Sequence, residues 1–345
     1  MRTKQRSFCL LALLVASYLS VLSVARAIPE TDYQSTYTNT ILPFRDSGER
    51  FTFYSADNKY RLSGVRFIHP RAKGVFVVIN GFTESWMKYG ELFYDLYQEG
   101  YSIISYDHRG QGVSPHLILD HPQVGFVDHF SDYSNDMNEF MAKIVTPMHH
   151  HRGGLFLLAN SMGGAVAAEY LEDHPSTFEA VVLSSPMLEI NTRPYPQFIA
   201  HAIVGSLSAI GFARRYAIGQ HNADLDATFR NNTLTGSKVR WWSYGYVGKE
   251  HPDILIGGAS NGWVNTSIST TSAIRKNIPK IMTRTLLLEA GKDSFVMNKP
   301  IKMASTQIPH ARLISFPDAR HGILMESDPI RNQALQQIES FFLEN

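Results

Sequence analysis

Short apolar runs recur along this 345-residue chain, and segments of helix length separate them. The runs occupy residues 74–80, 102–107, 155–160, 180–185, 285–290 and 312–316. Because they are apolar at successive positions, they predict strands that are buried on both faces, as in a parallel sheet. The helix-length segments are residues 86–99, 130–145, 163–173 and 328–343. This alternation predicts a doubly wound α/β fold, with a mostly parallel central sheet flanked by helices.

The residues before the first buried run follow a different pattern. Residues 51–54 and 60–68 are rich in strand formers on either side of a turn at residues 56–58, which predicts an opening β-hairpin. Residues 28–50 are polar, and we expect them to form an irregular leading arm.

One long interval breaks the alternation. Residues 187–271 contain aromatic residues, glycines and one amphipathic stretch at 198–210, but no strong buried-strand run. An interval of this length inside a regular α/β pattern favours an inserted helical cap over a loop. We therefore expect a core formed by residues 28–186 and 272–345, with the cap inserted between its two parts.

The first 27 residues have the pattern of a leader. Arg2, Lys4 and Arg6 form a positive head, residues 8–24 are apolar, and Ala-Arg-Ala at 25–27 is a small-x-small cleavage site. This arrangement predicts a secretory signal peptide and hence a periplasmic or secreted protein. The alternative is an uncleaved N-terminal membrane anchor, since the apolar run is nearly long enough to span a bilayer.

Loss of this leader changes the charge and the cysteine content. The chain has 32 basic and 31 acidic residues, and the leader holds four of the basic ones and none of the acidic ones. The remainder has a net charge of −3, without the basic surplus that nucleic-acid binding requires. Cys9 is the sole cysteine and lies in the leader, which excludes disulfides, thiol catalysis and cysteine–metal sites from the rest.

A serine follows the third buried run and precedes a helix rich in small residues. The segment reads Ala159-x-Ser161-x-Gly163, which matches the G-x-S-x-G nucleophile elbow except that alanine replaces the first glycine. The elbow exposes the serine oxygen at the sheet edge and directs the helix N-terminus towards a developing oxyanion. We therefore expect Ser161 to be a nucleophile and the Met162 amide to donate to the oxyanion.

The order of such a site along the chain is serine, acid, histidine. His321 lies between the last strand and the last helix, which places it at the sheet edge as a general base. Asp293 follows the preceding strand, 28 residues before His321, and is our candidate for the acid that orients it. Of the competing acids, Asp318 is too close in sequence, Asp328 is expected to be the N-cap of the final helix, and Glu289 lies within a strand.

The second oxyanion donor is expected in the loop after an early strand. Gly81 would allow the backbone to approach the serine, and the Phe82 amide is the expected donor. A site of this kind requires neither a metal nor an organic cofactor, and we predict none.

Several segments together resemble the α/β-hydrolase group that includes monoacylglycerol lipases and bacterial lysophospholipases. They are NGFTES at 80–85, YDHRGQGVS at 106–114, ANSMGG at 159–164, GKD at 291–293 and HG at 321–322. The likeness covers residues 51–343, and the cap segment 232–237 is similar to the lysophospholipase branch. Many relatives have histidine where this chain has Asn80 and glycine where it has Ala159. The resemblance implies an α/β-hydrolase fold with a cap, and a structural role for residues 106–114.

Three functions remain open from the sequence. The first is a serine hydrolase that cleaves carboxylic esters of single-chain lipids, namely a lysophospholipid or a monoacylglycerol, through an acyl-enzyme. The second is an aminopeptidase or small-ester hydrolase, for which Glu189, Asp224 and Asp226 are the candidate cap acids. The third is a non-catalytic binding protein, which the intact triad disfavours.

The cap also bears on the expected partners. Its apolar residues either line an acyl channel or form the cap's own core: Tyr195, Phe198, Ile199, Ile203, Leu207, Ile210 and Phe212. We expect a lipid-like substrate and transient contact of the cap with a membrane surface, and no nucleic acid. The sequence gives no oligomeric state.

Overall fold

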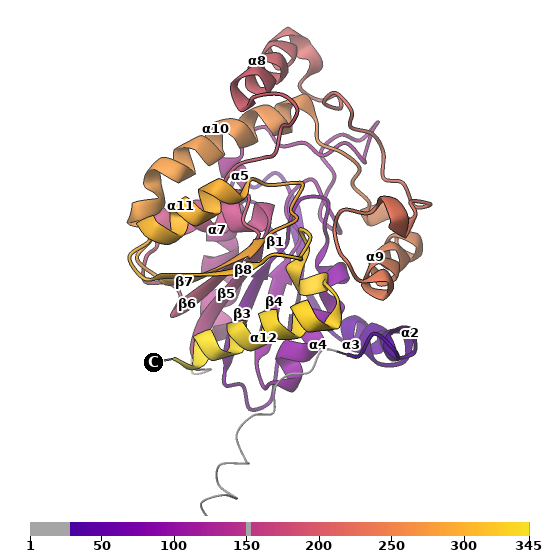
Figure 1. Cartoon of the computed structure of the whole chain (residues 1–345), viewed down its shortest axis with the longest axis vertical. Helices are drawn as coiled ribbons and strands as arrows, with labels where there is room; N and C mark the ends of the chain where they lie inside the picture. Colours follow the sequence, from indigo (N-terminus) through magenta and orange to yellow (C-terminus); the bar gives the residue numbers. More distant parts are fainter. Residues whose placement is uncertain (1–27, 150–152, 345) are drawn as a thin grey trace, which may run out of the picture.

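The protein is described by a computed structural model that covers residues 28–149 and 153–344 (Figure 1). The predicted signal peptide, residues 1–27, lies outside the described residues. Among the residues described, helices long and apolar enough to cross a bilayer are absent.

An eight-stranded sheet forms the centre of the molecule, in the order β1-β2-β4-β3-β5-β6-β7-β8. Its strands are β1 Glu49–Tyr54, β2 Arg61–Phe67, β3 Gly74–Ile79, β4 Ser102–Tyr106, β5 Gly154–Asn160, β6 Ala180–Ser184, β7 Arg284–Ala290 and β8 Ala311–Phe316. β2 pairs antiparallel with β1 and β4, and every pairing from β4 to β8 is parallel. The opening hairpin and the six predicted strands are therefore confirmed.

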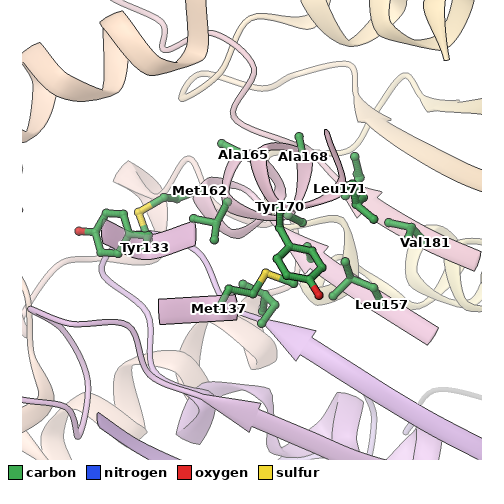
Figure 2. Packing of buried hydrophobic residues seen from close by; sticks show 14 of the residues in the cluster. Tyr133, Met137, Leu157, Met162, Ala165, Ala168, Tyr170, Leu171 and Val181 are labelled. Carbon is green, nitrogen blue, oxygen red and sulfur yellow. The ribbon is translucent and has the colours of Figure 1, made fainter. Parts of the chain in front are cut away.

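Helices cover both faces of the sheet, which confirms the predicted α/β architecture. Alternate residues of β3 point to opposite sides: Val75, Val77 and Ile79 belong to one hydrophobic core, and Phe76 and Val78 to the other. The first core packs under α5 Ser131–Phe140, α7 Met162–Asp173, α10 Asn261–Asn277 and α11 Asn298–Gln307. The second packs under α4 Gly90–Gln98 and α12 Asp328–Leu343. Figure 2 shows the small residues of α7 in the first core.

The predicted helices are present with modified ends. The segment 86–99 begins as a 3-10 turn, η2 Trp86–Tyr89, which the Ser85 side chain caps, before α4 continues. After α5, the segment 130–145 passes through a π-helical stretch, η3 Met141–Val145, into α6 Thr146–His149. Two further short turns, η7 Ile278–Lys280 and η8 Ile323–Met325, precede β7 and α12.

The leading arm is helical, so the prediction of an irregular arm at residues 28–50 is wrong. It forms α2 Tyr33–Thr36, a π-helical turn η1 Tyr37–Ile41, and α3 Leu42–Asp46. Tyr33, Tyr37 and Ile41 recur every fourth residue, and all three are buried in the second core. This spacing is a helical signal, but the polar residues between these positions hide it from a reading of composition.

The cap segment contains two helices that lie apart from each other, one at the top of the view and one at the right (Figure 1). α8 Gln197–Leu207 and its extension η4 Ser208–Phe212 pack on α10, whereas α9 Lys238–Glu250 packs against α2 and η2. The turns η5 Phe229–Asn231 and η6 Pro252–Ile254 flank α9. The expected end of the cap at residue 271 falls inside α10. This helix extends to Asn277 and packs against α7.

Much of the apolar surface of the cap faces solvent. Phe198 is 75% exposed and Ile210 is 69% exposed, and Tyr195, Ile199 and Phe212 are exposed as well. These five side chains therefore do not form a core for the cap, whereas Ile203 and Leu207 are half-buried.

Candidate active site

Ser161 occupies a strained turn between β5 and α7. Its φ and ψ are 53° and −118°, a conformation that non-glycine residues rarely adopt and that often marks a functional site. The helix after it passes very close to β3: a Cβ at Gly163 would lie 2.5 Å from the carbonyl oxygens of Ile79 and Asn80. A side chain at this position is therefore excluded, whereas Ala159, at the end of the buried strand, is accommodated.

His321 links Ser161 and Asp293 through its two ring nitrogens. Nε2 lies 2.8 Å from the Ser161 Oγ, and Nδ1 lies 2.6 Å from the Asp293 Oδ2. An ionised carboxylate only accepts, so Nδ1 carries the proton and Nε2 is free to accept from the serine hydroxyl. The three residues that the sequence singled out are thus brought together.

Asp293 is itself held in place. Its Oδ1 accepts hydrogen bonds from the amides of Phe295, at 2.8 Å, and Val296, at 3.0 Å, and its side chain is fully buried. These two bonds leave Oδ2 directed at the imidazole, which fixes the orientation of the ring.

The competing acids are occupied elsewhere. Asp318 pairs with Lys292 at the surface, and Glu289 accepts from Ser315 within the sheet. Asp328 is the first residue of α12, and the N-cap is Ser327, so the expectation that Asp328 is the N-cap is wrong. Its carboxylate pairs with Arg240 instead.

The predicted oxyanion donors lie on two elements beside the serine. Met162 is the first residue of α7, where backbone amides have no partner within the helix. On the other side, a Cβ at Gly81 would lie 2.8 Å from Glu84 Oε2 and 3.1 Å from the Ser161 Cβ, so a side chain there would crowd both residues. In the same loop, two residues after Gly81, Thr83 has a φ of 63°. The roles of the Met162 and Phe82 amides stay predictions.

Three contacts that the sequence did not reveal support this loop. The Gly81 amide donates to the Glu84 carboxylate at 2.6 Å, and the Tyr89 hydroxyl donates to the same oxygen. The Phe82 ring stacks on Trp263 of α10, with ring centroids 3.9 Å apart. No local motif predicts the stacking of Phe82 on Trp263, because the two residues are distant in sequence.

Asp107 connects the loop to the glycine-rich segment 106–114. Its carboxylate accepts from Asn80 Nδ2 at 2.8 Å, from Ser85 Oγ at 2.7 Å, and from the amides of Trp86 and Val113 at 2.6 and 2.8 Å. Burial raises the pKa of Asp107 to about 6, against the opposing effect of these hydrogen bonds. The segment is therefore a structural support for the loop at residues 80–85, as the resemblance implied.

His108 and Arg109 are both buried, and their polar contacts are to residues other than Ser161, Asp293 and His321. Burial lowers the pKa of His108 to about 4, and its Nε2 lies 3.3 Å from the Asn80 carbonyl oxygen. Arg109 forms a two-nitrogen pair with the Asp136 carboxylate, at 2.6 and 2.7 Å. Across residues 28–149 and 153–344, groups of three or more His, Cys, Asp or Glu side chains suited to a metal are absent.

The strained serine at the end of β5, the histidine after β8 and the parallel sheet with a cap define an α/β-hydrolase of the serine hydrolase class. Residues 70–328 match the family model described as serine aminopeptidase, S33. The chain belongs to this family, which confirms the predicted fold class and the resemblance.

Curated relatives agree with this assignment. The chain is 31% identical to the probable lysophospholipase L2 of Haemophilus influenzae over 84% of this chain and 90% of that protein. It is 34% identical to the lysophospholipase L2 of Escherichia coli K12 over 81% of this chain and 84% of that protein.

Solved structures share the fold at lower identity. A soluble variant of monoglyceride lipase from Saccharomyces cerevisiae matches with a TM-score of 0.68 and 18% identity, over 86% of this chain and 94% of that chain. A thermostable carboxyl esterase from Bacillus coagulans matches with a TM-score of 0.69 and 15% identity, over 86% of this chain and 97% of that chain.

Proposed function

We propose that this ester hydrolase cleaves the acyl ester of single-chain lipids, with a lysophospholipid as the first candidate substrate. The relatives at 31% and 34% identity carry the name lysophospholipase L2, whereas the monoglyceride lipase of known structure shares only the fold. A monoacylglycerol is the second candidate, because it presents the same ester and acyl chain without the phosphate headgroup.

The chemistry proceeds through an acyl-enzyme. Ser161 Oγ attacks the acyl carbon while its proton passes to His321 Nε2, and the tetrahedral oxyanion accepts hydrogen bonds from the Met162 and Phe82 amides. The intermediate collapses, and the alcohol leaves with the proton from His321. Water then attacks the acyl-enzyme, gives a proton to His321, and releases the fatty acid after that proton returns to Ser161. Asp293 stabilises the imidazolium at both steps.

One observation carries the proposal: His321 makes both hydrogen bonds that a general base requires, at 2.8 Å to Ser161 and 2.6 Å to Asp293. Such geometry in the resting protein is that of a competent nucleophile–base pair.

An aminopeptidase activity is less well supported. A free substrate amine needs an available carboxylate, and Glu189 already lies 3.5 Å from the Arg275 guanidinium. Asp226 is exposed next to Lys249, and Asp224 accepts from the Asp226 amide. Glu189 is thus paired with a cation, and Asp224 and Asp226 are exposed to solvent.

The exposed apolar residues of α8 and η4 suit contact with a lipid surface. A lysophospholipid resides in membranes and micelles, and large exposed apolar groups favour partition into such an interface. We therefore propose that this face of the cap touches the membrane transiently while substrate is withdrawn. Export to the periplasm or the exterior is proposed from the leader pattern alone.

A substrate panel tests the function. Wild type and Ser161→Ala are assayed on lysophosphatidylcholine, monoacylglycerol, p-nitrophenyl butyrate and aminoacyl amides, and both are treated with a fluorophosphonate probe. We expect turnover of the single-chain lipids, and loss of activity by about 10⁴-fold or more together with loss of labelling in Ser161→Ala. Aminoacyl amides as the sole good substrates would contradict the lipid assignment, and persistent labelling of Ser161→Ala would contradict the nucleophile.

A further inference from the structure

Residues 232–237 of the cap lie directly against the loop that carries His321. We call this segment the cap turn. Its Leu234 carbonyl accepts from the Gly322 amide at 2.8 Å, and the Thr235 hydroxyl donates to the Met325 carbonyl at 2.5 Å. The residue that follows the general base is therefore bonded to the cap through its backbone.

Two side chains of the histidine loop add further bonds to the cap turn. Arg320 Nη1 donates to the carbonyls of Asn232, at 2.8 Å, and Thr235, at 2.9 Å. The buried Glu326 carboxylate accepts from the Arg320 amide at 2.8 Å with one oxygen and from the Gly236 amide at 2.9 Å with the other. The residues on both sides of His321 are thus held by the same segment.

The Asn232 side chain gives the cap turn its shape. Its Oδ1 accepts from the amides of Leu234 and Thr235, at 2.7 and 3.1 Å, and its Nδ2 donates to the Thr235 carbonyl at 2.6 Å. The residue is 6% exposed, so water cannot readily replace these bonds. Without them, the carbonyls of the turn would no longer be presented to Arg320 and Gly322.

The cap turn is also fixed to the core. Ser237 caps α9 by accepting from the Arg240 amide, and the buried Arg240 pairs with Glu91 and with Asp328, each at 3.0 Å. The start of α9 therefore cannot shift without breaking buried ion pairs, a costly change.

We propose that the cap turn is a positioning element for the general base, with Asn232 as its principal positioning residue. The Ser185 hydroxyl holds the His321 carbonyl from the sheet side at 2.9 Å, and the cap turn holds Arg320 and Gly322 from the opposite side. Together they fix the backbone from which the imidazole reaches Ser161. This inference rests on the proposed function, because it assigns a role to His321 as the base.

The position of the cap turn determines the expected kinetic effect. A displacement of about 1 Å in a catalytic group can cost ~10²-fold in rate, even when the altered residue is remote from the reacting atoms. The bonds described run to the loop backbone, so their loss should lower kcat and the rate of fluorophosphonate labelling. KM for a small ester should change little, because such a substrate needs the base but not the cap's apolar surface.

The decisive comparison uses two buried cap asparagines. Asn232→Ala removes the bonds that shape the cap turn. The control, Asn261→Ala, changes a residue that is 3% exposed and whose Nδ2 donates to three cap carbonyls, those of Phe212, Arg215 and Tyr216. On p-nitrophenyl butyrate we expect kcat to fall by ~10- to 100-fold in Asn232→Ala, with KM within about threefold of wild type, and kcat to stay within about threefold in Asn261→Ala.

A second pair of variants remains informative if Asn232→Ala does not fold. Arg320→Met removes both bonds to the cap turn, whereas Arg320→Lys retains a cation that can donate to the same two carbonyls. We expect Arg320→Met to lower kcat and the labelling rate, and Arg320→Lys to restore most of both. Thermal unfolding of each variant, followed by circular dichroism, shows which ones are folded at the assay temperature.

Three outcomes would overturn the inference: an equal fall of kcat in Asn232→Ala and Asn261→Ala, a change confined to KM, or a folded Arg320→Met with wild-type labelling. Each leaves the proposed function intact so long as Ser161→Ala abolishes labelling. Failure of the proposed function is recognised separately, by labelling that persists in Ser161→Ala.

Discussion

Two adjacent buried residues, Asp107 and His108, respond to pH in opposite directions. Asp107 has a raised pKa of about 6 in the fold because of burial, so the folded state binds more protons than the unfolded one between pH 4 and 6. Ionisation of Asp107 therefore costs stability as pH rises through this window. His108 has a lowered pKa of about 4, also because of burial, so the unfolded state binds more protons between about pH 4 and 6.5. Its contribution to stability is lost as pH falls.

Replacement of His108 isolates the second effect, because Asp107 is present in both proteins. His108→Gln lacks the pH-dependent contribution of the histidine. From pH 7.5 to 4, the free energy of unfolding should therefore fall more steeply in wild type than in His108→Gln. The difference should reach about 3 kcal/mol, at roughly 1.4 kcal/mol per unit of pKa. Urea titrations at several pH values measure it, and parallel curves for the two proteins would show that His108 titrates normally in the fold.

The residues of the triad were predictable because each follows a strand in a motif with its own local signature. Ser161 follows a buried strand and precedes two glycines, and His321 lies between the last strand and the last helix. The supports of these residues were not predictable. Trp263 and the cap turn reach the site from distant parts of the chain, and their contacts depend on the packing of the cap rather than on any spacing.

At the level of elements, the arm that precedes β1 packs on the second core. Tyr33 donates to Glu91 at 2.9 Å, and Tyr37 packs edge-on against Trp242 of α9. The arm thus joins α4 and α9, so it contributes to the stability of both core and cap. The sequence concealed this role because the residues between Tyr33, Tyr37 and Ile41 are polar and mostly exposed.

A packed helical arm and an irregular arm predict different effects of mutation on the free energy of unfolding. Tyr37→Ala should lower the free energy of unfolding by about 3 kcal/mol, because it removes a buried aromatic ring. The matched change Tyr54→Ala, at an exposed ring on the edge strand β1, should cost less than about 0.5 kcal/mol. Chemical denaturation measures both. Equal small effects would mean that the arm is loose in solution, as an irregular segment would be.

At the scale of the whole molecule, the apolar cap surface and the C-terminus lie at opposite ends (Figure 1). Phe198 and Ile210 are exposed at the first end, and Leu343, which is 65% exposed, lies at the end of α12. If the cap contacts membranes, only the first set of residues should matter for binding.

Vesicle binding tests this asymmetry. Removal of two exposed apolar side chains in Phe198→Ser/Ile210→Ser should weaken partition into phosphatidylethanolamine–phosphatidylglycerol vesicles by about tenfold or more, since each buried side chain contributes about 1.5–3 kcal/mol. Leu343→Ser should bind as wild type does. Co-sedimentation with vesicles measures the partition, and equal binding by all three proteins would exclude this face of the cap as the contact.

The stack of Phe82 on Trp263 restricts how a lipid enters. Trp263 of α10 supports Phe82, whose amide is expected to face the oxyanion. A swing of α10 away from the core would therefore remove this support at the moment of substrate entry. Displacement of α8 alone would leave that support intact. A substrate that entered by displacing α8 alone would therefore find the loop around Phe82 still in place.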